Sequence, residues 1–113
     1  MFPRRFRRLL AGHEVRTTFE MGWSGLGNGA LLAQAARQFD AFLTVDQNVQ
    51  FQQNLAALPL SAGIIAAPDN RFETLAPFAP AVLDWLARPL GCELVRIEAN
   101  GQIVRVAPTR PQN

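Results

Sequence analysis

The stretch Ala41–Asp46, AFLTVD, decides the expected fold of the chain. Ala41 to Val45 is a short apolar run, interrupted only by Thr44, and it stops at an acid. A run of this length is typical of a strand buried on both faces of a parallel sheet. We therefore expect this strand to lie inside a sheet, with Asp46 at its carboxyl end.

Helices and strands are predicted to alternate on both sides of this run. Helices are expected over residues 29–39, capped by Asn28, over residues 49–58, and over residues 71–91 with a break at two prolines. A second apolar run, Gly63–Ala67, is again strand-like. Alternation of this kind predicts a small three-layer α/β domain with a mainly parallel central sheet covered by helices.

The amino-terminal part is predicted to add a helix and a strand. Pro3 can open a short helix, which Gly12 can end in a left-handed conformation. His13–Phe19, HEVRTTF, alternates apolar and polar residues as a half-buried strand would. A glycine-broken loop then leads to the helix that Asn28 is expected to cap.

A β-hairpin is predicted at the carboxyl end of the domain. Asn100-Gly101 is a strong signal for a two-residue hairpin turn. Counting back from a two-residue turn pairs Ile97 with Val104 and Val95 with Val106. The same register sets Arg96 opposite Arg105 on the other face of the hairpin.

The composition is that of a single domain. Of 113 residues, 49% are hydrophobic, which is enough for one packed core. We expect one domain over residues 1–107 and a loose tail over residues 108–113. No apolar run approaches the roughly 20 residues needed to cross a bilayer, and the lone Cys92 agrees with a reducing compartment. A cytoplasmic protein with no membrane partner is expected.

The positive charge of the chain is carried entirely by arginine, since all 11 basic residues are arginines. The lack of lysine excludes a phosphate-binding-loop lysine and Schiff-base chemistry. Four arginines fall within residues 4–8: Arg4, Arg5, Arg7 and Arg8. Guanidinium groups bind phosphates in bidentate geometry, so this cluster is either a nucleic-acid contact or a solvated helix face.

Asp46 has two interpretations on the sequence pattern alone. At the carboxyl end of a parallel strand it would face the crevice in which α/β sheets bind ligands, where a carboxylate can hold a divalent cation. It could instead cap the helix that follows. Asp69, just past the second apolar run, could approach the same edge, but it has the pattern of a turn or cap residue.

Four segments carry a resemblance to a known family. GHEVRT, MGWSGLGNG, LTVDQN and QQNL occur in this order between Pro3 and Leu86. The chain thereby resembles the small bacterial PIN-like proteins, a family of predicted nucleases related to the toxins of toxin–antitoxin pairs. The resemblance implies a PIN-like fold, Mg²⁺- or Mn²⁺-dependent cleavage of RNA, and an antitoxin protein as a possible partner.

The resemblance also assigns roles to particular residues. It implies that Asp46 is a catalytic acid and metal ligand, with Asn48 and Asn28 as further polar ligands of the metal. The arginines expected to contact RNA phosphates are Arg4, Arg5 and Arg8.

The chain departs from the family in three places. Relatives begin with a strand that ends in an Asp-Glu pair before the Pro-Arg segment, whereas this chain starts at Met1-Phe2-Pro3. Relatives often carry acids where this chain has Ala30 and Asn48. A gap in a parallel sheet exposes unpaired backbone, so we expect either a first strand encoded upstream of Met1 or a homodimer formed across the gap. The alternative function is a catalytically inactive PIN-like module that binds a protein partner or RNA.

Overall fold

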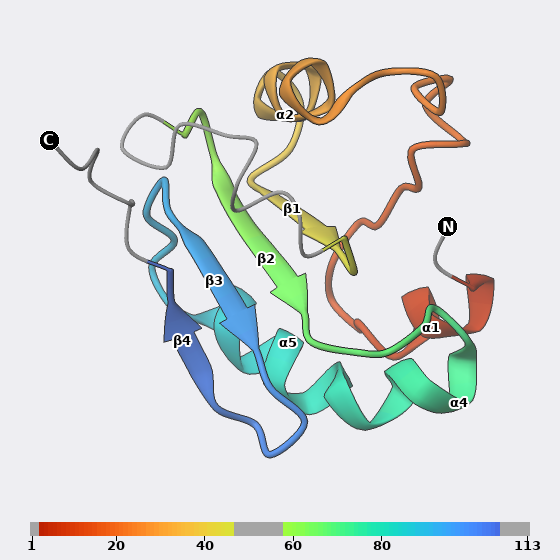
Figure 1. The fold of residues 1–113 in the computed structure, drawn as a ribbon, viewed down its shortest axis with the longest axis vertical. Helices are drawn as coiled ribbons and strands as arrows, with labels where there is room; N and C mark the ends of the chain where they lie inside the picture. Colours follow the sequence, from red (N-terminus) through yellow and green to blue (C-terminus); the bar gives the residue numbers. More distant parts are fainter. Residues whose placement is uncertain (1–2, 47–57, 107–113) are drawn as a thin grey trace, which may run out of the picture.

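A mixed four-stranded sheet forms the centre of the domain in the computed structural model, which describes residues 3–46 and 58–106 (Figure 1). The strands lie in the order β1-β2-β3-β4. β1 and β2 are parallel, as are β2 and β3, while β3 and β4 are antiparallel. Their bounds are Ala41–Thr44 for β1, Ser61–Ile65 for β2, Leu94–Ile97 for β3 and Ile103–Arg105 for β4.

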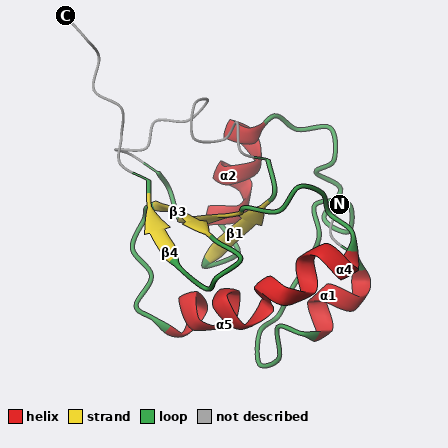
Figure 2. Cartoon of the chain, turned by 60° about the horizontal axis from the view of Figure 1, so that its bottom comes forward, coloured by secondary structure: helices red, strands yellow, loops and turns green. Residues whose placement is uncertain are grey.

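Helices cover both faces of this sheet (Figure 2). The helices are α1 (Arg4–Arg8), α2 (Asn28–Ala36), α4 (Phe72–Leu75), the 3-10 turn η2 (Ala76–Phe78) and α5 (Ala79–Ala87). α2 lies on one face, whereas α1, α4 and α5 lie on the other. The predicted α/β class and the mainly parallel sheet are therefore confirmed. Within the described ranges no helix has the length and apolarity to cross a membrane.

Strand β2 divides the core into two layers. Its five residues are all buried, and their side chains alternate between the faces. Ala62 and Ile64 pack with Leu32 of α2, while Ile65 packs with Trp85 of α5. Both layers thus depend on one fully covered strand, as expected for a parallel sheet with helices on each face.

The expected break in the long helical segment is present. Pro77 lies in η2, and Pro80 follows Ala79 at the start of α5. Proline lacks the amide that a helix interior needs, but it is tolerated in the first turn, so a new helix begins there. The spacing predicts Val82, Leu83, Trp85 and Leu86 on the core side of α5; Val82 and Trp85 are buried there, whereas Leu83 and Leu86 are half-buried against the same core.

Strand β1 occupies the edge of the described sheet, which corrects the prediction of a central strand. It pairs only with β2 among the described residues, and its four residues are half-buried. Its side chains do contact both layers, because Leu43 packs with the α5 layer and Phe42 with the α2 layer. The apolar run is therefore explained by burial of both faces of β1. It does not indicate whether a second strand pairs with β1 on the side away from β2.

The segment HEVRTTF is not a strand, although its alternation predicted one. Residues 14–17 have no regular structure, and residues 18–20 form a turn. The backbone N–H of Thr17 donates to the Glu20 carboxylate at 3.0 Å, and the N–H of Glu20 donates to Thr17 Oγ1 at 3.1 Å. These reciprocal bonds satisfy backbone groups locally, in the manner of a capping box, and they fix the turn.

The carboxyl-terminal hairpin is present with a register that differs from the prediction. Ile97 pairs with Ile103, and Val95 pairs with Arg105. The N–H of Glu98 donates to the carbonyl of Gln102 at 2.8 Å, so residues 99–101 form the loop, with Gly101 at φ +88°. A three-residue loop with a left-handed glycine replaces the expected two-residue turn and shifts the pairing by one residue.

Two predicted boundaries also move. The N-cap of α2 is Gly27 rather than Asn28, and Asn28 is the first residue of the helix. Strand β2 begins at Ser61, two residues before the predicted start. Gly12, the expected left-handed residue after the first helix, does adopt φ +88°. The helix predicted over residues 49–58 lies almost entirely outside the described residues.

Candidate functional site

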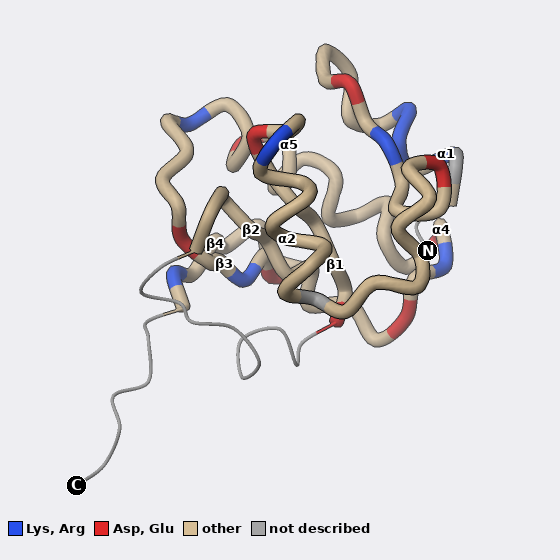
Figure 3. Tube along the Cα trace, turned by 90° about the horizontal axis from the view of Figure 1, so that it is seen from above, with Lys and Arg blue, Asp and Glu red and all other residues tan. Residues whose placement is uncertain are grey.

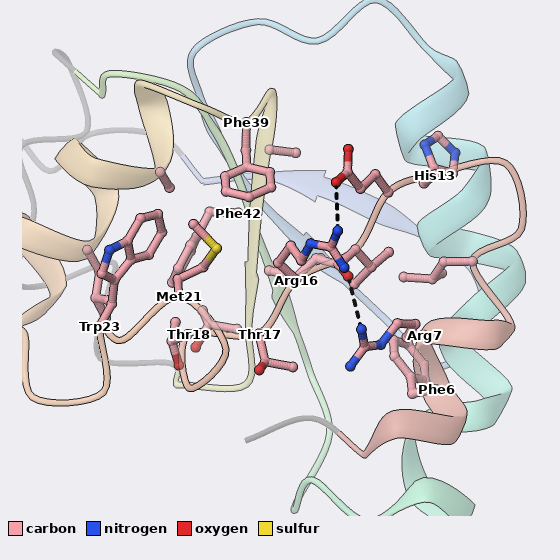
Figure 4. Close-up of a pocket in the computed structure, with 18 of the residues that line it drawn as sticks. Phe6, Arg7, His13, Arg16, Thr17, Thr18, Met21, Trp23, Phe39 and Phe42 are labelled. Atoms are coloured by element: carbon pink, nitrogen blue, oxygen red, sulfur yellow. Dashed lines mark hydrogen bonds and ion pairs between the residues drawn. The ribbon is translucent and has the colours of Figure 1, made fainter.

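A cavity of about 500 Å³ runs along the edge of β1 that pairs with no other described strand (Figure 4). Every residue from Asp40 to Asp46 lines it. Residues 13–18 line it as well, and the chain passes beside β1 there before it turns towards α2 (Figure 1). The cavity is therefore a channel between an edge strand and a segment that forms no ladder with it.

The remaining walls of this cavity are largely apolar. They come from α1 and the residues after it, from α2 and the loop before it, and from α5. Their apolar residues include Phe6, Leu10, Met21, Trp23, Leu31 and Leu86. Trp23 meets Phe39 edge to face, with ring centroids 6.3 Å apart. An apolar lining of this size is typical of a ligand or peptide site.

The charged groups on the amino-terminal wall are already paired. Arg7 lies 2.9 Å from the Glu20 carboxylate and also donates to the carbonyl of Val15 at 3.4 Å. Arg16 lies 3.0 Å from Glu14. The contacts of Arg7 connect α1 to Val15 and Glu20, whereas the Arg16–Glu14 pair lies within the wall segment itself.

Asp46 lies at the carboxyl end of β1, where the sequence predicts it. Its residue is half-buried and lines the cavity, and its backbone N–H donates to Thr44 Oγ1 at 3.0 Å. Asn70, which follows β2 by five residues, lines the same cavity. A residue that follows β2 thus lines the same cavity as Asp46, which follows β1.

Asp69 has the structural role that its sequence pattern predicts. Its carboxylate accepts the backbone N–H of Arg71 at 2.9 Å, and this hydrogen bond lowers the pKa of the Asp69 carboxyl. It does not line the cavity, whereas its neighbour Asn70 does. Asn70 was not among the predicted site residues, because the acids were the candidate ligands at this edge; its position just past the second apolar run was the available signal.

The arginines expected to contact phosphates all belong to α1. Arg4 begins this helix, and Arg8 is exposed at its end. Arg5 lies 3.8 Å from Glu73, with its guanidinium 4.3 Å from the centroid of the Phe72 ring. In Figure 3, α1 lies on the opposite side of the domain from β3 and β4. Arg5 and Arg8 do not line the cavity, but Arg7 does.

The donor set fits a divalent metal only in part. Oxygen ligands suit Mg²⁺ and Mn²⁺, and Asp46 supplies one carboxylate. Within residues 3–46 and 58–106, no three His, Cys, Asp or Glu side chains gather as a metal site would require. Asn28 is the first residue of α2, and Asn48 lies outside the described residues. A single carboxylate binds Mg²⁺ weakly unless substrate oxygens and water complete the shell.

Glu20 gives the amino-terminal wall a predictable acid sensitivity. The hydrogen bond from the Thr17 N–H, and then Arg7, lower the pKa of its carboxyl below 4.5. A depressed folded-state pKa stabilises the fold above the unfolded value, and this stabilisation is lost as the pH falls through the folded value. We expect Glu20→Gln to lower the Tm at pH 7, and the difference from the unmodified chain to shrink as the pH falls and the Glu20 carboxylate becomes protonated.

Thermal melts followed by circular dichroism between pH 3 and 7 measure this effect. Glu14→Gln is the matched control, because its ion pair with Arg16 joins residues only two positions apart. An exposed local pair contributes little, so this variant should track the unmodified chain at every pH. A Glu20→Gln difference that stays constant with pH would contradict the proposed role of the ionised carboxylate.

Comparison with protein-family models, with curated proteins and with solved structures gives no match for this chain.

Proposed function

We propose that this chain is a PIN-like domain of the metal-dependent ribonuclease class, with its site centred on Asp46. The observation that carries the proposal is the position of this one acid: it follows the parallel strand β1 and lines the large cavity beside that strand. Crevices at the carboxyl ends of parallel strands are where α/β domains bind their ligands. The segments GHEVRT, MGWSGLGNG and LTVDQN add support through their resemblance to the PIN-like family.

Asp46 would hold Mg²⁺ or Mn²⁺ in this proposal, with the amide oxygens of Asn70 and Asn48 as candidate partners. A divalent metal in such a site activates a water molecule and offsets the charge that develops on a phosphodiester. The chain itself contributes the carboxylate and a cavity with largely apolar walls beside it. The arginines of α1, namely Arg4, Arg5 and Arg8, are the proposed phosphate contacts. The toxin of a toxin–antitoxin pair is the proposed biological role.

A second function is favoured by a specific observation. No cluster of three potential metal ligands is found in the described residues, so the acid count there falls short of a nuclease site. A PIN-like module that has lost its acids would keep the cavity and bind RNA or a protein partner without cleavage. The same experiment separates the two functions.

The experiment is cleavage of a fluorescently labelled single-stranded RNA in the presence of Mn²⁺. For the nuclease, Asp46→Ala should reduce the rate at least about 100-fold, as removal of a group that stabilises the transition state typically does. Asp84→Ala is the control, since Asp84 is an exposed acid of α5, ion-paired with Arg88, and does not line the cavity. It should cleave at the unmodified rate.

Two results would count against the nuclease. Equal cleavage by the unmodified chain and by Asp46→Ala would remove Asp46 from the mechanism. The absence of cleavage in both, together with RNA or protein binding that survives the Asp46→Ala change, would support the binding module.

A further inference from the structure

The backbone of β1 presents hydrogen-bonding groups to the cavity. In β2, the amides of Ala62 and Ala66 donate to carbonyls of Glu93 and Ile97, each at 3.0 Å. These residues therefore face β3, and the alternate residues of β2 face β1. Ser61 and Gly63 thus face β1, and their register partners there are Ala41 and Leu43. In a parallel ladder the register partner of a residue that faces its neighbour points away, so Ala41 and Leu43 turn their N–H and C=O groups away from β2.

These outward groups border the cavity. Ala41 and Leu43 both line it, and among the described residues no backbone hydrogen bond reaches them from the far wall. Both residues are half-buried, so their outward groups can exchange hydrogen bonds to water for hydrogen bonds to a ligand. A polypeptide backbone is the ligand whose spacing matches such an edge.

The shape of the cavity limits what can reach the edge. Paired strands lie about 4.8 Å apart, so a second folded copy would have to bring its own edge that close to β1. Residues 13–18 stand on the far side of the cavity, tied to α1 through Arg7. This wall stands in the way of a second sheet, whereas the cavity volume of about 500 Å³ is of the size that a short extended segment would occupy.

The apolar lining of the cavity favours an inserted segment with apolar side chains. Leu10 and Leu86 contribute from the side of α1 and α5, while Leu31 and Phe39 contribute from the side of α2. A strand inserted here would therefore bury apolar residues on both of its faces. β1 has four residues, and four residues of an inserted strand would extend about 13 Å.

We infer that the cavity binds an extended apolar segment of a partner polypeptide, which adds to β1 as a further strand. Pairing with the backbone groups of Ala41 and Leu43 supplies the alignment, and the apolar walls bind the side chains. The loop between residue 18 and α2 carries two exposed apolar residues, Phe19 at 69% and Leu26 at 39% exposure, which offer further contact area for a partner. This inference requires no metal and does not rest on the nuclease proposal.

The test uses a synthetic peptide in which the apolar sequence Val-Ile-Leu-Val is flanked by two lysines at each end. Binding is followed through the fluorescence of Trp23, which lies in the cavity wall, and through amide exchange measured by NMR. We expect saturable binding and at least tenfold slower exchange of the Ala41 and Leu43 amides. The Phe42 and Thr44 amides already face β2 and should change little.

Two variants show whether backbone pairing is responsible. A peptide with the same side chains but N-methylated at alternate apolar residues cannot form the ladder and should bind at least tenfold more weakly. In the protein, Ala41→Pro removes an outward amide at the first residue of β1, where proline is tolerated. It should weaken binding while the melting of the free protein stays cooperative.

Several results would overturn the inference. Equal binding of the plain and N-methylated peptides would mean that side chains fill the cavity without strand addition. Protection of Ala41 and Leu43 that rises with protein concentration in the absence of peptide would identify a second copy as the occupant. Displacement of the peptide by RNA, with affinity that falls steeply with salt, would assign the cavity to nucleic acid.

Discussion

Trp85→Ala is expected to destabilise the domain by about 3–5 kcal/mol, which is the usual cost of deleting a buried aromatic side chain. Trp85 is 5% exposed and belongs to the layer between the sheet and α5. Domains of this kind have about 5–15 kcal/mol of unfolding free energy, so a large share would be lost. Urea unfolding of the variant and the unmodified chain measures the difference.

The reason for this cost is the fit between Trp85 and strand β2. A Cβ added at Gly63 would lie 3.1 Å from two atoms of the Trp85 ring and 3.2 Å from Leu43. The indole therefore occupies the space above Gly63, and its removal leaves a hole that no neighbouring side chain of β2 can fill. Glycine in a buried strand is otherwise unfavourable, so this close packing explains its presence.

Two further variants check that explanation. Trp85→Phe keeps most of the ring and should lose less stability than Trp85→Ala. Gly63→Val alone should cost about 1–3 kcal/mol through overpacking, but in a Trp85→Ala background its methyl groups would enter the hole. The double variant should therefore be more stable than the sum of the single changes predicts, whereas simple additivity would contradict direct packing.

Much of the fold is predictable because apolar patterns report covered faces. The runs around Leu43 and Ile64 do form neighbouring parallel strands, and the break at Pro77 and Pro80 does divide the helical segment. These features depend on local sequence and on burial. Both can be inferred from the order of apolar and polar residues.

The predictions that were wrong concern which strand or backbone group a segment pairs with. An alternating segment such as His13–Phe19 needs a neighbouring strand, and the bonds between Thr17 and Glu20 form a turn instead. Similarly, the Asn100-Gly101 signal locates a turn but does not fix its length, which the bond from Glu98 to Gln102 sets. The edge position of β1 follows the same rule, since an apolar run reveals both faces of a strand but neither edge.

The residues of the candidate site also fall into those that the sequence predicts and those that it does not. The sequence pattern predicts the position of Asp46 because strand ends follow from the apolar run. It does not predict Asn70, because the choice between adjacent residues after a strand depends on the path of the turn. Nor does it predict that Arg7, rather than Arg5 or Arg8, would line the cavity, since a helix of five residues presents its side chains in different directions.

A second large effect is expected in the amide exchange rates of β1. If one edge of this strand is open, its amides should alternate in exchange rate along four residues. Phe42 and Thr44 face β2, and their amides should exchange only through opening of the sheet. Ala41 and Leu43 face the cavity, where no described backbone group accepts from them. Exchange free energies in one protein range from near zero to the global value, so a difference of at least about 100-fold is expected.

Amide hydrogen exchange of the isolated chain, resolved by NMR for Ala41, Phe42, Leu43 and Thr44, tests most directly the claim that the second edge of β1, which no other described strand pairs with, faces the cavity. Fast exchange at Ala41 and Leu43 with slow exchange at Phe42 and Thr44 is the predicted result. Equal protection of all four amides at low protein concentration would contradict it, since the edge would then already be paired.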